Sequence, residues 1–256
     1  MSQRSNVDIA SRDLARGFEP VLLMQDAGMR PDPWQEQVLR SDARRMMLCC
    51  SRQSGKSTTC SAIALHRAIY WPRSLVLLLS PSERQSKELH RKVVDHWKAL
   101  DGAPRAISES TLQLELENRS RICALPGSEQ TIRGYSAPDL ILLDEAAHTL
   151  DSLISAVLPM QATNSYGRII VLSSPNGRTG WFCEAWMNDG TWEKTLVTYR
   201  GCPRISEENV MFFRRTMGEL MFRQEFLCEF LDLAAQVFPL EVIEKAFNSE
   251  LMAWRI

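Results

Sequence analysis

The feature of this sequence that most limits its fold is a repeated alternation between short apolar runs and longer amphipathic stretches. Uninterrupted apolar runs are typical of strands buried on both faces, and amphipathic stretches are typical of the helices that cover them. Strands are therefore expected at residues 46–50, 75–80, 122–125, 140–144, 169–173 and 195–199, and helices at 33–40, 55–70, 83–99, 150–159 and 179–187. This order predicts an α/β fold with a mostly parallel sheet, flanking helices and right-handed crossovers.

Two regions depart from this alternation. Residues 111–117 alternate apolar and polar side chains, which predicts a half-exposed strand paired with 122–125 across a turn at 118–120. From residue 201 onward, 203–231 and 239–247 have a helical period with no strand-like run between them. We therefore expect an α/β core in residues 1–200 and a small helical subdomain in 201–256.

The composition disfavours several classes of protein. Thirty Lys and Arg against 31 Asp and Glu leave almost no net charge, so binding to nucleic acid would need a local basic patch. The seven cysteines include no Cys-x-x-Cys pair, which favours free thiols in a reducing compartment over a zinc site or disulfide framework. No apolar run approaches the ~18 residues that span a bilayer. A soluble, cytoplasmic protein without a membrane partner is expected.

A candidate phosphate-binding loop follows the first predicted strand, where the sequence reads CCSRQSGKS over residues 49–57. The backbone N–H groups of such a loop and of the following helix terminus face phosphate oxygens. Gly55 permits close approach of the backbone, Lys56 supplies a positive charge for the β- and γ-phosphates, and the Ser57 hydroxyl can bind Mg²⁺. The candidate nucleotide contacts are Arg52, Gln53, Ser54, Gly55, Lys56, Ser57 and Thr58.

The loop does not satisfy the strict pattern G-x-x-x-x-G-K-[ST], because Cys50 stands where the first glycine belongs. A bare Gly-Lys-Ser occurs by chance in many chains. Taken alone, the segment is equally compatible with an ordinary turn between a strand and a helix.

A pair of acidic residues ends the predicted strand at 140–144, where LILL is followed by Asp144 and Glu145. Ligands of open α/β sheets bind at the carboxyl ends of the strands. Asp144 can hold hydrated Mg²⁺ opposite Ser57, and Glu145 can orient and polarise the attacking water. An acidic loop after a buried strand is the common alternative. The order, spacing and strand context of the two motifs together favour an ATPase that uses ATP and Mg²⁺.

These residues resemble the ATPase domain of the large terminase subunit, the DNA-packaging motor of tailed double-stranded DNA bacteriophages. Arg52–Ser57 is similar to that family's deviant phosphate loop, which often lacks the first glycine and carries an arginine. Residues 142–147 (LLDEAA) resemble its Mg²⁺/glutamate motif. Ser173, Ser174 and Pro175, followed by Asn-Gly, resemble its coupling motif, and residues 222–230 resemble the helix that closes its ATPase region. The resemblance implies a P-loop fold of the RecA/ASCE type.

The resemblance suggests two further assignments that the residues alone leave open. Trp34 and Gln35 resemble the adenine-recognition motif, with Gln35 on the adenine edge; a buried tryptophan beside a surface glutamine is the alternative. Arg133 stands where the family is thought to place an arginine that reaches a neighbouring subunit's site. Arg52, acting within its own subunit, is the competing candidate for this catalytic role, and a solvated arginine is the alternative for both.

The resemblance implies ATP-driven translocation of double-stranded DNA into a viral procapsid in the infected host cell. It also implies a homo-oligomeric ring, expected to be a pentamer, with the portal protein and the small terminase subunit as partners. A superfamily-2-like helicase module is an alternative, although no second RecA-like domain is visible. A nucleotide-binding assembly subunit without turnover is another. The family's nuclease domain has no counterpart before Ile256, so no DNA cleavage is expected from this chain, and residues 236–239 resemble the start of the interdomain junction.

Several residues outside these motifs have conventional explanations. Arg84, Lys87, Arg91 and Lys98 share one helix face, for which solvation is favoured over contact with DNA phosphates, and Arg214, Arg215 and Arg223 are treated alike. His90 and His96 are expected on the surface. His148 is a possible neighbour of the catalytic acids, and Trp181, Trp186 and Trp192 are expected in the core.

Overall fold

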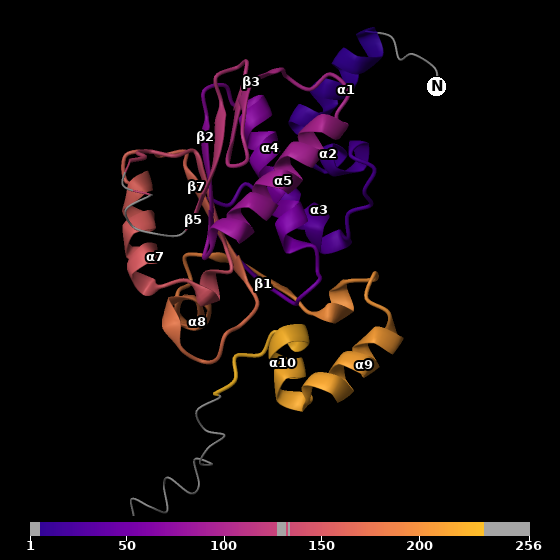
Figure 1. Cartoon of the computed structure of the whole chain (residues 1–256), viewed down its shortest axis with the longest axis vertical. Coiled ribbons are helices and arrows are strands. Elements are labelled where there is room, and N and C mark those ends of the chain that lie inside the picture. Colours follow the sequence, from indigo (N-terminus) through magenta and orange to yellow (C-terminus); the bar gives the residue numbers. More distant parts are fainter. Residues whose placement is uncertain (1–5, 127–131, 133, 233–256) are drawn as a thin grey trace, which may run out of the picture.

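The computed structural model describes residues 6–126, 132 and 134–232, and its centre is an eight-stranded sheet (Figure 1). The strand order is β3-β4-β5-β2-β6-β7-β1-β8. The strands are β1 (Arg45–Cys50), β2 (Leu75–Ser80), β3 (Ala106–Glu109), β4 (Gln113–Leu116), β5 (Arg121–Pro126), β6 (Leu140–Asp144), β7 (Arg168–Ser173) and β8 (Glu193–Val197). All pairs from β5 to β8 are parallel, whereas β3 and β4 extend the sheet as antiparallel strands. The predicted α/β class with a mostly parallel sheet is confirmed.

Helices cover both faces of this sheet (Figure 1). One face packs against α2 (Val21–Asp26), α3 (Pro33–Arg40), α4 (Lys56–Tyr70) and α5 (Glu83–Ala99). The other packs against α7 (Asp151–Val157) and α8 (Gly180–Asn188). Burial on both sides explains why the central strands read as continuous apolar runs: all five residues of β6 are buried.

Most predicted elements match the structure closely. The predicted bounds of β2, β6, α3 and α5 are those observed, and the hairpin between residues 113–116 and β5 is present. The strand predicted at 195–199 is wrong by two residues at each end. β8 is an edge strand whose pairing with β1 begins at Glu193, and Tyr199 already belongs to a 3-10 helix (Tyr199–Gly201). The bounds of β8 are therefore set by its hydrogen-bonded pairing with β1 and not by the extent of the apolar run. The predicted helix at 150–159 ends at Val157 and continues as a 3-10 helix, Leu158–Gln161.

Sequence patterns missed β3, α2 and the N-terminal helix α1 (Asn6–Phe18). Helix α1 leaves its large apolar side chains Val7, Leu14 and Phe18 exposed, and a buried polar contact attaches it: the Arg16 guanidinium, 1% exposed, donates to Asp26 Oδ2 at 2.6 Å. The predicted helical stretch at 203–231 is two helices, α9 (Glu207–Met217) and α10 (Glu219–Leu227), which meet at Gly218. They enclose a cluster of Val210, Phe222 and Phe226. The helix expected at 239–247 lies outside the described residues.

Side-chain burial overturns one expectation. All seven cysteines are free thiols, as predicted, and all seven are also buried. His90 and His96 are not surface residues: they are 1% and 5% exposed, because the inner face of α5 packs on α4 and the sheet. The His96 ring nitrogen Nδ1 lies 3.2 Å from the Ser61 hydroxyl on α4. Across the described residues, we find no helix with the length and apolar character needed to cross a membrane.

Candidate active site

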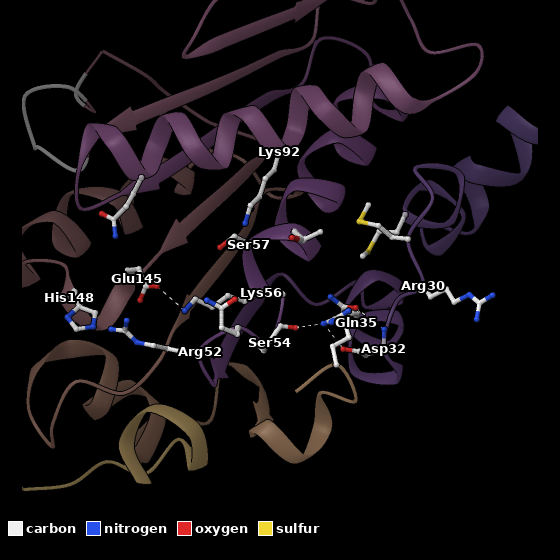
Figure 2. A pocket seen from close by; sticks show the side chains of 17 residues that line it. Arg30, Asp32, Gln35, Arg52, Ser54, Lys56, Ser57, Lys92, Glu145 and His148 are labelled. Atoms are coloured by element: carbon white, nitrogen blue, oxygen red, sulfur yellow. Dashed lines mark hydrogen bonds and ion pairs between the residues drawn. The ribbon is translucent and has the colours of Figure 1, made fainter. Parts of the chain in front are cut away.

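The loop between β1 and α4 forms one wall of a cleft of about 960 Å³ at the carboxyl ends of the strands (Figure 2). Gly55 precedes the first residue of α4 with φ +91°, a conformation that favours glycine. A Cβ at this position would lie 3.0 Å from Gln35 Nε2 and 3.0 Å from Arg204 Nη2. The N–H groups of the first turn of α4 have no acceptor within the helix, so this end of the cleft suits an anion.

The acidic pair meets this loop from across the sheet. One strand, β7, separates β1 from β6, and parallel pairing brings the ends of all three strands to the same edge. The Ser57 hydroxyl donates to Asp144 Oδ2 at 3.0 Å. Burial raises the pKa of Asp144, Glu145 raises it further, and Lys56 opposes both. A hydroxyl and a carboxylate held together are oxygen donors that fit Mg²⁺.

Glu145 is held by two side chains that the sequence motifs had singled out. Lys56 Nζ lies 2.9 Å from Glu145 Oε1, and the Ser173 hydroxyl donates to Glu145 Oε2 at 3.4 Å. Burial lowers the pKa of Lys56, but the two carboxylates outweigh burial and the net shift is upward. Glu145 itself has φ 54° and ψ 45°, a left-handed conformation that is uncommon outside glycine and concentrates at functional sites.

The opposite end of the cleft contains Gln35, which is 1% exposed. Its Oε1 accepts from the Asp32 backbone N–H at 2.8 Å, and its Nε2 donates to the Thr59 hydroxyl at 2.8 Å. The first contact completes a capping box at the start of α3. Gln35 is therefore not the surface glutamine of the alternative interpretation. Trp34 is buried in the core and does not line the cleft.

Comparison with known proteins decides the family of this chain. The family model described as "Terminase large subunit, T4likevirus-type, N-terminal" matches residues 47–245, well over half of the sequence. The chain belongs to this terminase family. The match includes both nucleotide motifs and helices α9 and α10, and it does not favour the helicase alternative.

Individual terminases agree with this assignment. The terminase large subunit of Thermus virus P23-45 is 26% identical over 82% of this chain and 51% of its own length. The chain thus spans about half the length of the curated relatives it matches. The ATPase domain of the Thermus phage P74-26 large terminase superposes with a TM-score of 0.70 at 23% identity, covering 81% of this chain and 97% of that domain. The large terminase of another thermophilic bacteriophage, in complex with ADP, gives 0.66 at 12% identity, covering 78% and 54%. Both structures share the fold.

In this terminase fold, the segment predicted for coupling connects the acids to α10. Ser173 also accepts a hydrogen bond from the Ala147 N–H at 3.2 Å, and Ser174 and Pro175 are buried beside it. Two residues later, the Gly177 N–H donates to Gln224 Oε1 of α10 at 3.0 Å. The turn after β7 therefore has one contact at Glu145 and another on α10.

The phosphate-loop arginine of this terminase chain also contacts α10. Arg52 Nε donates to Glu225 Oε2 at 2.7 Å, and its backbone N–H donates to the Glu225 carbonyl at 3.0 Å. The Arg52 side chain is 60% exposed, whereas that of Glu225 is 5% exposed. The hydrogen bond to Glu225 raises the pKa of Arg52. Arg133, the competing candidate for the arginine role, lies outside the described residues.

Sequence motifs missed other groups that line the cleft, including Arg204 and Lys92. Arg204, from the irregular segment before α9, lies 2.8 Å from Asp32 Oδ2 and donates to the Ser54 carbonyl at 2.8 Å. A single arginine in a loop has no recognisable pattern. The remaining loop residues line the cleft as expected, with Gln53 exposed, Ser54 buried and Thr58 half-buried. His148 lies beside Arg52 and Glu145 (Figure 2).

Proposed function

We propose that this chain is the ATP-hydrolysing domain of a large terminase and that it uses Mg²⁺. The observation that carries the proposal is the meeting of Lys56 with Glu145 and of Ser57 with Asp144, where the cleft and an adjoining groove share the carboxyl edge of the sheet. The ADP-bound terminase of the thermophilic bacteriophage, which shares the fold at 12% identity, supports a nucleotide as the ligand.

The four side chains have separable roles in this proposal. Ser57 and Asp144 hold Mg²⁺, which neutralises charge on the phosphate oxygens when bound. Lys56 exchanges Glu145 for the β- and γ-phosphates when the nucleotide enters. The released Glu145 carboxylate accepts a proton from the water that attacks the γ-phosphorus, while the bond to the β–γ bridging oxygen breaks. Gln35 and Trp34 are the candidates for adenine recognition, Gln35 directly and Trp34 by packing behind it.

The test is a comparison of turnover and binding in Glu145→Gln. The substitution keeps the size of the side chain but removes the proton acceptor. We expect turnover to fall by roughly 10²–10⁴-fold, with ATP affinity retained. Unchanged turnover would remove Glu145 from the mechanism, and a wild-type protein that binds ATP without turnover would favour an assembly subunit.

We further propose that hydrolysis drives double-stranded DNA into a procapsid in the cytoplasm of the infected host, with identical chains in a ring. Membership in the terminase family supports this role, and the same argument suggests the portal protein and small terminase subunit as partners. The ring size of five, and Arg133 as a residue acting on the neighbouring site, are part of the same proposal. If so, specific ATPase activity rises with protein concentration and with duplex DNA, and Arg133→Ala flattens the concentration dependence. A rate independent of concentration contradicts the ring.

A further inference from the structure

Helix α5 contains one basic residue that differs from the others. Arg84, Lys87, Arg91 and Lys98 are exposed, and three of them form ion pairs with Glu83, Glu88 and Glu109. Lys92 is half-buried on another face, and within the described part of the chain it has no hydrogen bond or ion pair. Figure 2 shows its side chain extending from the helix toward Ser57. Lys92 therefore lies near the site with its ammonium available.

The position of Lys92 assigns it to one end of the nucleotide cleft. It lines both that cleft and an adjoining groove of about 380 Å³. Ser57, Asp144 and Glu145 line the groove, whereas Gly55 and Gln35 line only the cleft. Lys92 is thus next to the proposed metal ligands, Ser57 and Asp144, and to Glu145. It is remote from the end of the cleft that contains Gln35, the candidate for adenine recognition.

The charges around Asp144 and Glu145 favour a second cation near the site. Two carboxylates, Asp144 and Glu145, line the groove, and the ammonium of Lys56 contacts Glu145 from the cleft beside it. Arg52 is near, but its guanidinium is hydrogen-bonded to Glu225.

The backbone of α5 holds this lysine in place. Leu89 and Val93, its neighbours on the inner face, are 2% and 0% exposed in the core. A rigid helix with a flexible ammonium at its surface is suited to an anion whose exact position changes during a reaction. The γ-phosphate is such an anion, because it separates from the β-phosphate on hydrolysis.

We propose that Lys92 binds the γ-phosphate from the side opposite the phosphate loop and thereby distinguishes a nucleoside triphosphate from a diphosphate. This inference rests on the proposed ATPase function. It makes Lys92 a second lysine of the site, supplied by α5 rather than by the loop. If Lys92 only balances the charge of the buried acids, its removal should change the affinities for the triphosphate and the diphosphate equally.

The experiment compares Lys92→Met with Lys87→Met, an exposed lysine of the same helix that pairs with Glu83. Displacement of a fluorescent ADP analogue by ADP and by ATP-γ-S, with Mg²⁺, gives both affinities. We expect Lys92→Met to weaken ATP-γ-S by about 10–100-fold, the range for a hydrogen bond to a charged group, with ADP affinity within about twofold of wild type. Lys87→Met should leave both affinities unchanged, and Lys92→Arg should retain part of the preference.

The outcomes separate this inference from the proposed function. Equal losses for ADP and ATP-γ-S in Lys92→Met, or no loss for either, overturn the γ-phosphate role while leaving the ATPase proposal intact. Wild-type protein that binds neither nucleotide overturns both. If Lys92→Met unfolds at a lower temperature than wild type, the folded Lys92→Arg variant is the deciding protein. A Lys92→Arg variant that loses affinity for ADP and ATP-γ-S equally contradicts the proposal.

Discussion

The carboxyl edge of the sheet lines the cleft, whereas the α9–α10 segment contacts the loops beside it, and the two regions are held in different ways. At the sheet edge, Asp144 and Lys56 continue directly from buried elements, β6 and α4. The α9–α10 segment has its own small cluster, Val210, Phe222 and Phe226, and exposes large apolar side chains such as Met211 and Phe212. The core therefore fixes the groups to which we assign the chemistry, while the helical segment depends on a few contacts.

Those contacts are mostly polar and converge on the nucleotide elements. Glu225 holds Arg52 of the phosphate loop, Gln224 holds Gly177 of the turn after β7, and the Cys228 thiol lies 3.4 Å from the Val197 carbonyl of β8. A few polar contacts of this kind can break and reform with small movements, whereas a close-packed core cannot rearrange in the same way. If the proposed nucleotide site drives movement, we therefore expect the α9–α10 segment to move before the core does.

The largest expected effect tests whether the two regions unfold separately. Leu142→Ala, in the fully buried centre of β6, should lower the global free energy of unfolding by about 2–5 kcal/mol in urea denaturation. Phe226→Ala removes a side chain of similar burial from the small cluster, yet should act mainly on local opening, seen as faster hydrogen exchange in α10. A global loss from Phe226→Ala as large as that from Leu142→Ala would show one cooperative unit.

A smaller effect tests the polar attachment. Arg52→Met leaves the buried Glu225 carboxylate without its guanidinium, and we expect the docking of α10 to weaken by about 1–3 kcal/mol, read as faster hydrogen exchange in residues 219–227. Arg223→Met is the matched control, because the Arg223–Glu229 pair is 40% and 37% exposed and should contribute about 0–1 kcal/mol. Equal exchange rates in the two variants would contradict the assigned difference.

The same contrast explains what could be predicted from the sequence. Continuous apolar runs located the central strands, and the residues that follow them predicted on sequence grounds alone that Lys56, Ser57, Asp144 and Glu145 would lie together. Side chains that reach the cleft only because distant parts of the chain pack together have no recognisable sequence motif. Arg204 comes from an irregular loop, and Lys92 stands beside Arg91 in a helix whose basic residues all looked solvated. The prediction that His90 and His96 lie on the surface was wrong, because both belong to the inner face of α5.

The smallest effect concerns the packing behind the site, where burial lowers the pKa of His96 to about 4. The unfolded chain binds a proton near pH 6.5 and the folded chain does not, so the contribution of His96 to stability is present above pH 6.5 and is lost as the pH falls toward 4. Between pH 7 and pH 6 the free energy of unfolding should fall by about 0.7 kcal/mol more in wild type than in His96→Gln. Because His96 belongs to the α4–α5 face, the loss should be in global unfolding. If lowering the pH instead speeds hydrogen exchange only in α10, His96 acts on the α9–α10 segment. That result would contradict the distinction between the core and this segment.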